Sequence, residues 1–99
     1  MATKMHRSSG NVFRDLGFDT QEAENLRLRS ELMIHVREVI ERRHLTQSAA
    51  ATLFGVTQPR ISDLVRGRID LFGLDTLVNM LAAARVRVKL VVKRSPQVA

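Results

Sequence analysis

The spacing of apolar residues changes along the chain and divides it into helical segments and one extended segment. Over residues 20–43, apolar side chains recur at helical spacing, which predicts one long helix. Asp19 and Glu22 have the spacing of a capping box at its start. The inward stripe of this helix is expected to contain Leu26, Leu32, Met33, Val36, Val39 and Ile40.

A last helix is expected over residues 74–85, after a short loop in which Gly73 can serve as the N-cap. The apolar residues assigned to its inner face are Leu74, Leu77, Val78, Leu81 and Ala82. Phe54 and Phe72 are expected to be core or loop-anchoring side chains.

From residue 86 to residue 93 the pattern alternates between apolar and basic residues and is rich in β-branched side chains, which predicts a β-strand. An isolated strand leaves its backbone N–H and C=O groups unpaired, so it needs a second edge. The simplest solution is the same strand of a second copy, which forms an antiparallel ribbon across a two-fold axis. The side chains that we expect at this dimer interface are Val86, Val88, Leu90 and Val92.

The segment of residues 11–18, NVFRDLGF, offers another partner for this strand, within one chain or between chains. It is short and interrupted by Gly17, so it does not predict a helix with any strength. Phe13 and Phe18 are expected to pack either on the protein's own body or on a partner.

Two short helices joined by a tight turn are predicted within residues 47–67, QSAAATLFGVTQPRISDLVRG. Thr46 can cap the first helix, and Gly55 is placed to leave it in a left-handed conformation. Thr57 caps the second helix, Pro59 falls in its first turn, and Gly67 ends it. The local signals therefore define the limits of both helices.

Small and apolar residues in this segment are spaced to pack the second helix against the first. Ala51 allows close approach of the two backbones, while Val56, Ile61 and Leu64 anchor the second helix in the core. The residues left facing outward are Gln58, Arg60, Ser62, Asp63 and Arg66. Gln and Arg are residue types that bond purine edges bidentately in the major groove. The segment is therefore interpreted as a helix-turn-helix.

The residues that define this pattern are Gln47, Ala51, Gly55, Val56, Ile61, Ser62, Leu64 and Gly67. Together they resemble the helix-turn-helix of the lambda-repressor-like (XRE) family. A longer similarity, through residues 11–18, 22–33, 45–68 and 74–81, resembles an XRE-type subfamily of antitoxins encoded beside RelE/HigB-like toxins. The resemblance implies a mainly all-α, lambda-repressor-like bundle and a RelE/HigB-like ribonuclease toxin as a possible partner.

Individual roles follow from residue type and position. Gln58 is the strongest candidate for reading a base, through adenine N6 and N7, and Arg60 suits either guanine or a phosphate. Asp63 either accepts from cytosine N4 or holds Arg60 or Arg66 in place. Phosphate contacts are expected from residues near helix ends. The full candidate DNA-binding set is Gln47, Thr57, Gln58, Arg60, Ser62, Asp63, Arg66 and Arg68.

The net charge of +6 is distributed unevenly along the 99 residues. Up to Glu41, six Lys/Arg stand against seven Asp/Glu, a balance of −1, and from Arg42 onward ten stand against three, a balance of +7. The basic excess thus belongs to the half with the helix-turn-helix, where attraction to phosphates is its simplest use. A merely soluble basic surface is the alternative explanation.

The composition excludes several other classes of function. There is no cysteine, and no apolar run has the roughly 18 residues that a membrane span needs, so a cytoplasmic protein is expected. His6, His35 and His44 are not spaced as a metal site, and the sequence SSG at residues 8–10 is not a nucleophile elbow. We therefore expect no cofactor, no metal and no enzymatic activity.

One small domain is predicted, with a leader and docking segment at residues 1–19, a helix-turn-helix domain at 20–85, and a strand and tail at 86–99. The expected function is a sequence-specific repressor, a homodimer that binds palindromic double-stranded DNA. By resemblance it is an antitoxin that autoregulates its operon. The alternatives are a stand-alone or phage-like XRE-type regulator without a toxin, and a module that binds protein or RNA.

Overall fold

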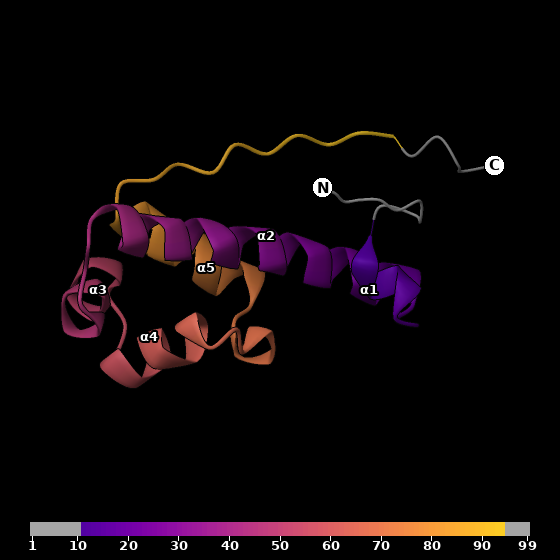
Figure 1. Cartoon of the computed structure of the whole chain (residues 1–99). Coiled ribbons are helices and arrows are strands. Elements are labelled where there is room, and N and C mark those ends of the chain that lie inside the picture. The colour runs from indigo at the N-terminus through magenta and orange to yellow at the C-terminus, as the bar shows by residue number, and fades with distance from the viewer. Residues whose placement is uncertain (1–10, 95–99) are drawn as a thin grey trace.

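The long helix α2 (Thr20–Arg42) is the element on which the rest of the fold is assembled (Figure 1). The computed structural model describes residues 11–94, so residues 1–10 of the predicted leader and docking segment and residues 95–99 of the predicted strand and tail lie outside the described residues. The other helices are α1 (Val12–Asp15), α3 (Gln47–Phe54), α4 (Gln58–Val65), the 3-10 helix η2 (Ile69–Leu71) and α5 (Leu74–Ala83). The mainly all-α prediction is confirmed.

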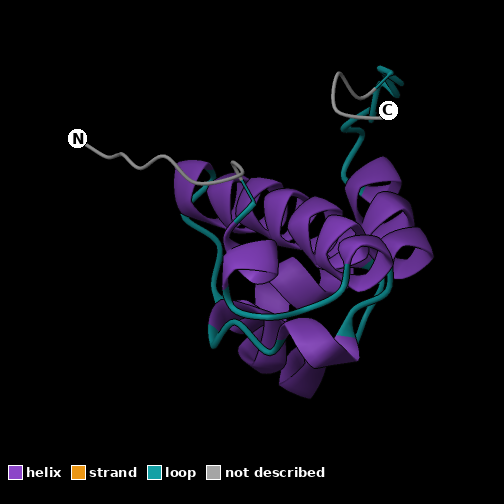
Figure 2. Ribbon diagram, turned by 90° about the vertical axis from the view of Figure 1, so that its right-hand side faces the viewer, coloured by secondary structure: helices purple, strands orange, loops and turns teal. Residues whose placement is uncertain are grey.

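α5 packs along α2, while α3 and α4 lie across one side of this pair (Figures 1 and 2). Buried residues from α2, α3, α4 and α5, together with Phe72 and Ala84, form one core. The predicted α2 stripe is confirmed, because Leu26, Met33 and Val36 are buried and the other members pack against the core. Phe54 and Phe72 are also buried, as expected.

The inner face of α5 differs in part from the prediction. Leu77 and Leu81 are buried, but Val78 is 39% exposed and Ala82 is exposed, while Met80 and Ala84 are buried instead. α5 is apolar around much of its circumference, so its sequence allows two overlapping stripes. Packing on α2 selects the one that contains Met80 and leaves Val78 at the flank.

Residues 11–18 form one helical turn, α1, that packs on the beginning of α2. The Asn11 side chain accepts bonds from the N–H groups of Phe13 (2.9 Å) and Arg14 (3.4 Å), and donates to the Ala23 carbonyl (3.2 Å). The Phe13 and Phe18 rings meet edge to face at 6.2 Å. The segment packs on its own chain as a helical turn, so its proposed pairing with the C-terminal strand within one chain is wrong.

Residues 86–94, here called the C-terminal arm, are extended but form no strand in the described part of the chain. The predicted β-strand is therefore wrong for the single chain, and the physical reason is that a strand is defined by ladder hydrogen bonds to a neighbour. Arg85, with φ 64°, turns the chain after α5, and the Val86 N–H donates to the Leu81 carbonyl at 2.8 Å. The arm then runs back above α2 (Figure 1).

Candidate nucleic-acid interface

The turn between α3 and α4 has the predicted local geometry. The Thr46 hydroxyl accepts from the Ala49 N–H at 3.0 Å, and the Thr57 hydroxyl accepts from the Arg60 N–H at 3.3 Å. Gly55 has φ 72°, and a Cβ placed on it would meet no atom within 4 Å. Glycine is therefore required at this position by backbone conformation and not by lack of space. The predicted limits of α3 are confirmed.

Ile61 and Leu64 attach α4 to the core, because both side chains are fully buried. Ala51 is buried in α3, and the contacts between α3 and α4 bring the two helices together as predicted. Val56 packs against the core from the turn. This anchoring determines which side of α4 remains available to another molecule.

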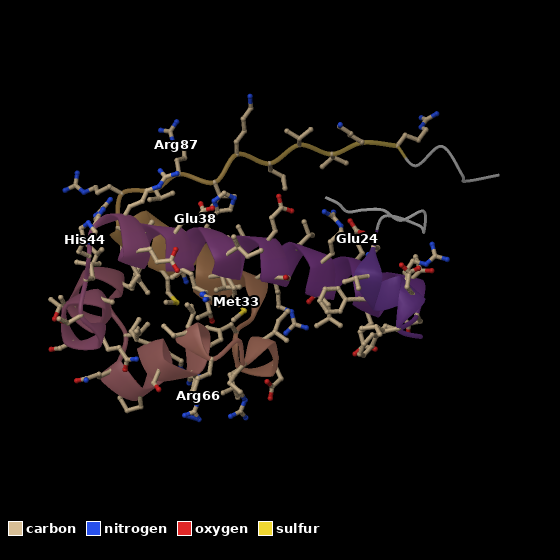
Figure 3. The ribbon with its side chains drawn as sticks, viewed as in Figure 1. Glu24, Met33, Glu38, His44, Arg66 and Arg87 are labelled. Carbon is tan, nitrogen blue, oxygen red and sulfur yellow. The ribbon has the colours of Figure 1, made fainter. Side chains whose placement is uncertain are left out.

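The outer face of α4 carries the polar residues Gln58, Ser62, Asp63 and Arg66, together with Pro59 and Val65, which is 38% exposed. Gln58 and Arg66 are exposed, and Ser62 and Asp63 are half-buried. Residues four apart on a helix lie above one another, so Gln58, Ser62 and Arg66 form one line along this face. Figure 3 shows Arg66 pointing away from the body of the protein. The structure thus brings four of the predicted DNA-binding residues together on one surface.

Arg60 departs from this surface. Its guanidinium Cζ lies 5.5 Å from the centroid of the Phe72 ring, and its Nη1 donates to the Leu71 carbonyl at 3.4 Å. No ion pair joins Asp63 to Arg60 or to Arg66 among the described residues, so the structure does not contain the arrangement in which Asp63 holds either arginine. Arg60 is held by the η2 turn instead.

Arg29 on α2 approaches the same turn. Its Nη1 donates to the carbonyls of Ile69 (3.3 Å) and Phe72 (3.4 Å), and its buried Nε has no hydrogen-bond partner. The turn that carries these carbonyls, η2, is absent from the sequence predictions. No local signal reveals the Arg29 contacts, since the contacting residues are separated by 40 and 43 positions.

The remaining predicted residues lie around α4. Gln47 is the exposed first residue of α3, and Thr57 is the N-cap of α4. Arg68 follows α4 in the loop, where its Nε lies 3.8 Å from the Asp70 carboxylate. Gly67, with φ 76°, ends α4 as predicted.

The basic excess of the second half of the chain is not centred on α4. Residues 42–84 contain five Lys/Arg and three Asp/Glu, a balance of +2, while residues 85–94 contain five cations and no anion. The arm that carries most of this charge lies on the other side of α2 from α4, as the positions of Arg87 and Arg66 show (Figure 3). Half of the ten cations in residues 42–94 therefore lie in residues 85–94, away from α4.

Two further properties concern residues 11–94. None of their helices is both long enough and apolar enough to cross a membrane. Within this range, no group of three or more His, Cys, Asp or Glu side chains is arranged to hold a metal ion.

Comparisons with known proteins found one matching family and a similar solved structure. The sequence model of a family described as "Helix-turn-helix domain" matches residues 12–93. The fold is similar to a solved structure named "Putative XRE Family Transcriptional Regulator", with a TM-score of 0.70 and 29% identity over 79% of this chain and 88% of that chain. Among curated proteins, none matches. The similarity thus covers α1 to the C-terminal arm and not the α3–α4 segment alone.

Proposed function

The chain belongs to the helix-turn-helix domain family, and we propose that it is a sequence-specific DNA-binding repressor that places α4 in the major groove. The observation that carries the proposal is the division of α4 into two faces. Ile61 and Leu64 are fully buried, while Gln58 and Arg66 are exposed on the outer face. The major groove of B-DNA, about 12 Å wide, admits a helix presented in this way.

Gln58 is the first residue of α4, next to its N-cap Thr57. In helix-turn-helix proteins the N-terminal residues of the recognition helix contact base edges, and glutamine bonds adenine bidentately through N6 and N7. We assign base reading to Gln58, with Ser62 and Asp63 further along the helix. Arg66 and Arg68 contact phosphates, as do Gln47 and the Thr57 N–H. Arg60 is assigned an indirect part, because its guanidinium bonds the η2 turn.

A homodimer on a palindromic operator is part of this proposal. Two copies of α4 read two half-sites separated by about one helical turn, roughly 34 Å. The unpaired C-terminal arm supports the dimer, since its alternating pattern suits pairing with a second arm. The side chains Val86, Val88, Leu90 and Val92 are assigned to the dimer interface.

The antitoxin role is the more specific part of the proposal and is supported by the sequence resemblance to antitoxins beside RelE/HigB-like toxins. The exposed side chains of Val12 (60%), Leu16 (68%) and Phe18 (41%) on and beside α1 offer an apolar contact surface for such a partner. If a short RelE-like reading frame adjoins the gene, its product is expected to co-purify with this chain and to lose ribonuclease activity in the complex. A gene without such a reading frame beside it favours the stand-alone regulator.

Duplex binding tests the main proposal directly. The full chain is titrated with its own upstream promoter fragment and with a scrambled duplex over a range of salt concentrations. We expect a palindromic footprint, tighter binding to the promoter by at least about a thousandfold, and loss of affinity with rising salt. Equal affinity for both duplexes, or tighter binding to RNA, would overturn sequence-specific repression and support an interaction module.

A further inference from the structure

A groove of about 960 Å³ separates the C-terminal arm from the flank of α2 and α5. Its apolar floor comes from both helices, from Leu28 and Leu32 on α2 and from Leu74, Val78 and Leu81 on α5. Apolar surface that lines an open groove is removed from water when another apolar element covers it, which lowers the free energy.

The arm lines the same groove and adds a second set of apolar side chains to it. Val86 packs against the core, and Val88, Leu90 and Val92 follow at the two-residue period that keeps them on one face of an extended chain. Their exposure rises from 38% at Val88 to 82% at Leu90 and 84% at Val92. The arm therefore leaves the body progressively and covers the groove without filling it.

In the described part of the chain, the backbone N–H and C=O groups of the arm beyond Val86 also lack hydrogen-bond partners. Among the described residues, residues 87–94 make no backbone hydrogen bond after the bond from the Val86 N–H to Leu81. An extended edge of this kind pairs with another strand. Two identical arms related by a two-fold axis meet antiparallel, with the same residues on both sides of the interface.

Charge distinguishes the two surfaces that each copy offers. The arm and the residue before it carry Arg85, Arg87, Lys89, Lys93 and Arg94 without an anion, and none of these five is in an ion pair within the described chain. The α2 flank carries Glu24 and Glu31 at the groove, with Glu38 pointing to the same side (Figure 3).

One cation on α2 partly balances this flank. Arg27 bonds Glu24 at 2.6 Å and lies 3.5 Å from Glu31, and the hydrogen bond to Arg27 lowers the pKa of Glu24. Glu24, Glu31 and Glu38 against Arg27 leave a balance of −2 on this flank of α2, while the arm that forms the other wall of the groove carries Arg87, Lys89 and Lys93. Each copy thus has a basic arm and an acidic α2 flank, so the arm of each copy is opposite in charge to the flank of the other.

We propose that the groove receives the C-terminal arm of a second copy, paired antiparallel with the first arm, so that its apolar side chains cover Leu28, Leu32 and Val78. The inference rests on the homodimer of the proposed function and adds the half of the interface that lies on α2 and α5. It supplies the ladder that the arm lacks, the apolar cover that the groove lacks and countercharges for the arm. The groove lies on the other side of α2 from α4, so both α4 helices stay free.

Sedimentation equilibrium of the full chain without DNA tests this arrangement, with Val78→Glu as the main variant. Val78 is already 39% exposed, so the charge is tolerated in the monomer, which circular dichroism checks. We expect the dimer dissociation constant to rise at least about tenfold, because the apolar side chains of the second arm would cover the new carboxylate and remove it from water, which outweighs its attraction to the arm's cations. The matched control is Ile34→Glu, which changes an apolar residue of α2 that is 52% exposed and does not line the groove. The control is expected to leave the constant unchanged.

The outcomes separate this inference from the proposed function. A wild-type chain that stays monomeric, or a Val78→Glu chain that dimerises like the wild type, overturns the groove inference. If the wild-type chain binds the operator as a dimer and Val78→Glu has the same dimer dissociation constant, the proposed function stands and the groove inference fails. Half-site binding by a monomeric Val78→Glu chain supports both, since α4 is then intact and only the pairing is lost.

Discussion

The guanidinium of Arg60 lies over the ring of Phe72, with its Cζ 5.5 Å from the ring centroid. Phe72 is fully buried, and Arg60 also bonds the carbonyl of the neighbouring Leu71. Arg29 bonds the Ile69 and Phe72 carbonyls from the α2 side. Two arginines thus join α4 and α2 to the η2 turn, and these contacts add to the anchoring of α4 by Ile61 and Leu64.

Arg60→Ala should lower the free energy of unfolding by about 1 kcal/mol, because it removes a cation–π contact and a hydrogen bond to a carbonyl. DNA affinity should fall on all sequences without a change in base preference. Urea denaturation and binding to a set of single-base operator variants measure the two effects. Arg66→Ala is the control: stability stays within about 0.5 kcal/mol, and the slope of affinity against salt falls by about 1. Altered preference at one base pair in Arg60→Ala would show that Arg60 reads a base.

Gln58→Ala should weaken operator binding by about 1–3 kcal/mol and relax preference at one base position, because it removes a bidentate bond to a base edge. Affinity for random duplex should stay nearly intact. Fluorescence anisotropy with operator and random duplexes measures the difference. An equal loss on both would rule out base reading by Gln58.

Gly55→Ala should destabilise the protein by about 1–2 kcal/mol, because φ 72° forces an L-residue into the left-handed region. The strain is purely conformational, since no atom lies within 4 Å of the added Cβ. His44, which ends α2 with φ 51°, allows the opposite change. His44→Gly should raise the free energy of unfolding by up to about 1 kcal/mol. Thermal and urea unfolding at fixed protein concentration measure both changes. A shift of the free energy of unfolding in the same direction for both variants would contradict this account.

Proline at Val88 or at Leu90 should give monomers in analytical ultracentrifugation, because proline removes an N–H that the paired arms need. The monomer fold should be unaffected, since neither residue makes a backbone hydrogen bond in the described chain. Far-ultraviolet circular dichroism checks that the helices remain. A dimer of unchanged affinity would mean that the arms do not pair.

The turn and the helix limits around α3 and α4 are determined by the sequence alone, because their causes are local. A threonine cap bonds an N–H three residues ahead, and Gly55 adopts a positive φ without reference to the rest of the fold. The α2 stripe is read from the sequence for the same reason, since its period is a property of one helix. These local signals define the candidate interface.

Only the tertiary structure decided the contacts of Arg60 and Arg29, since the carbonyls they bond lie 11, 40 and 43 residues away in the chain. It also selected Met80 over Val78 on α5, where packing on α2 chose between two apolar stripes that the sequence allows equally. The C-terminal arm likewise depends partly on the sequence and partly on the tertiary structure. Its alternating pattern specifies an extended chain, but a strand needs a neighbouring edge, and the described single chain provides none.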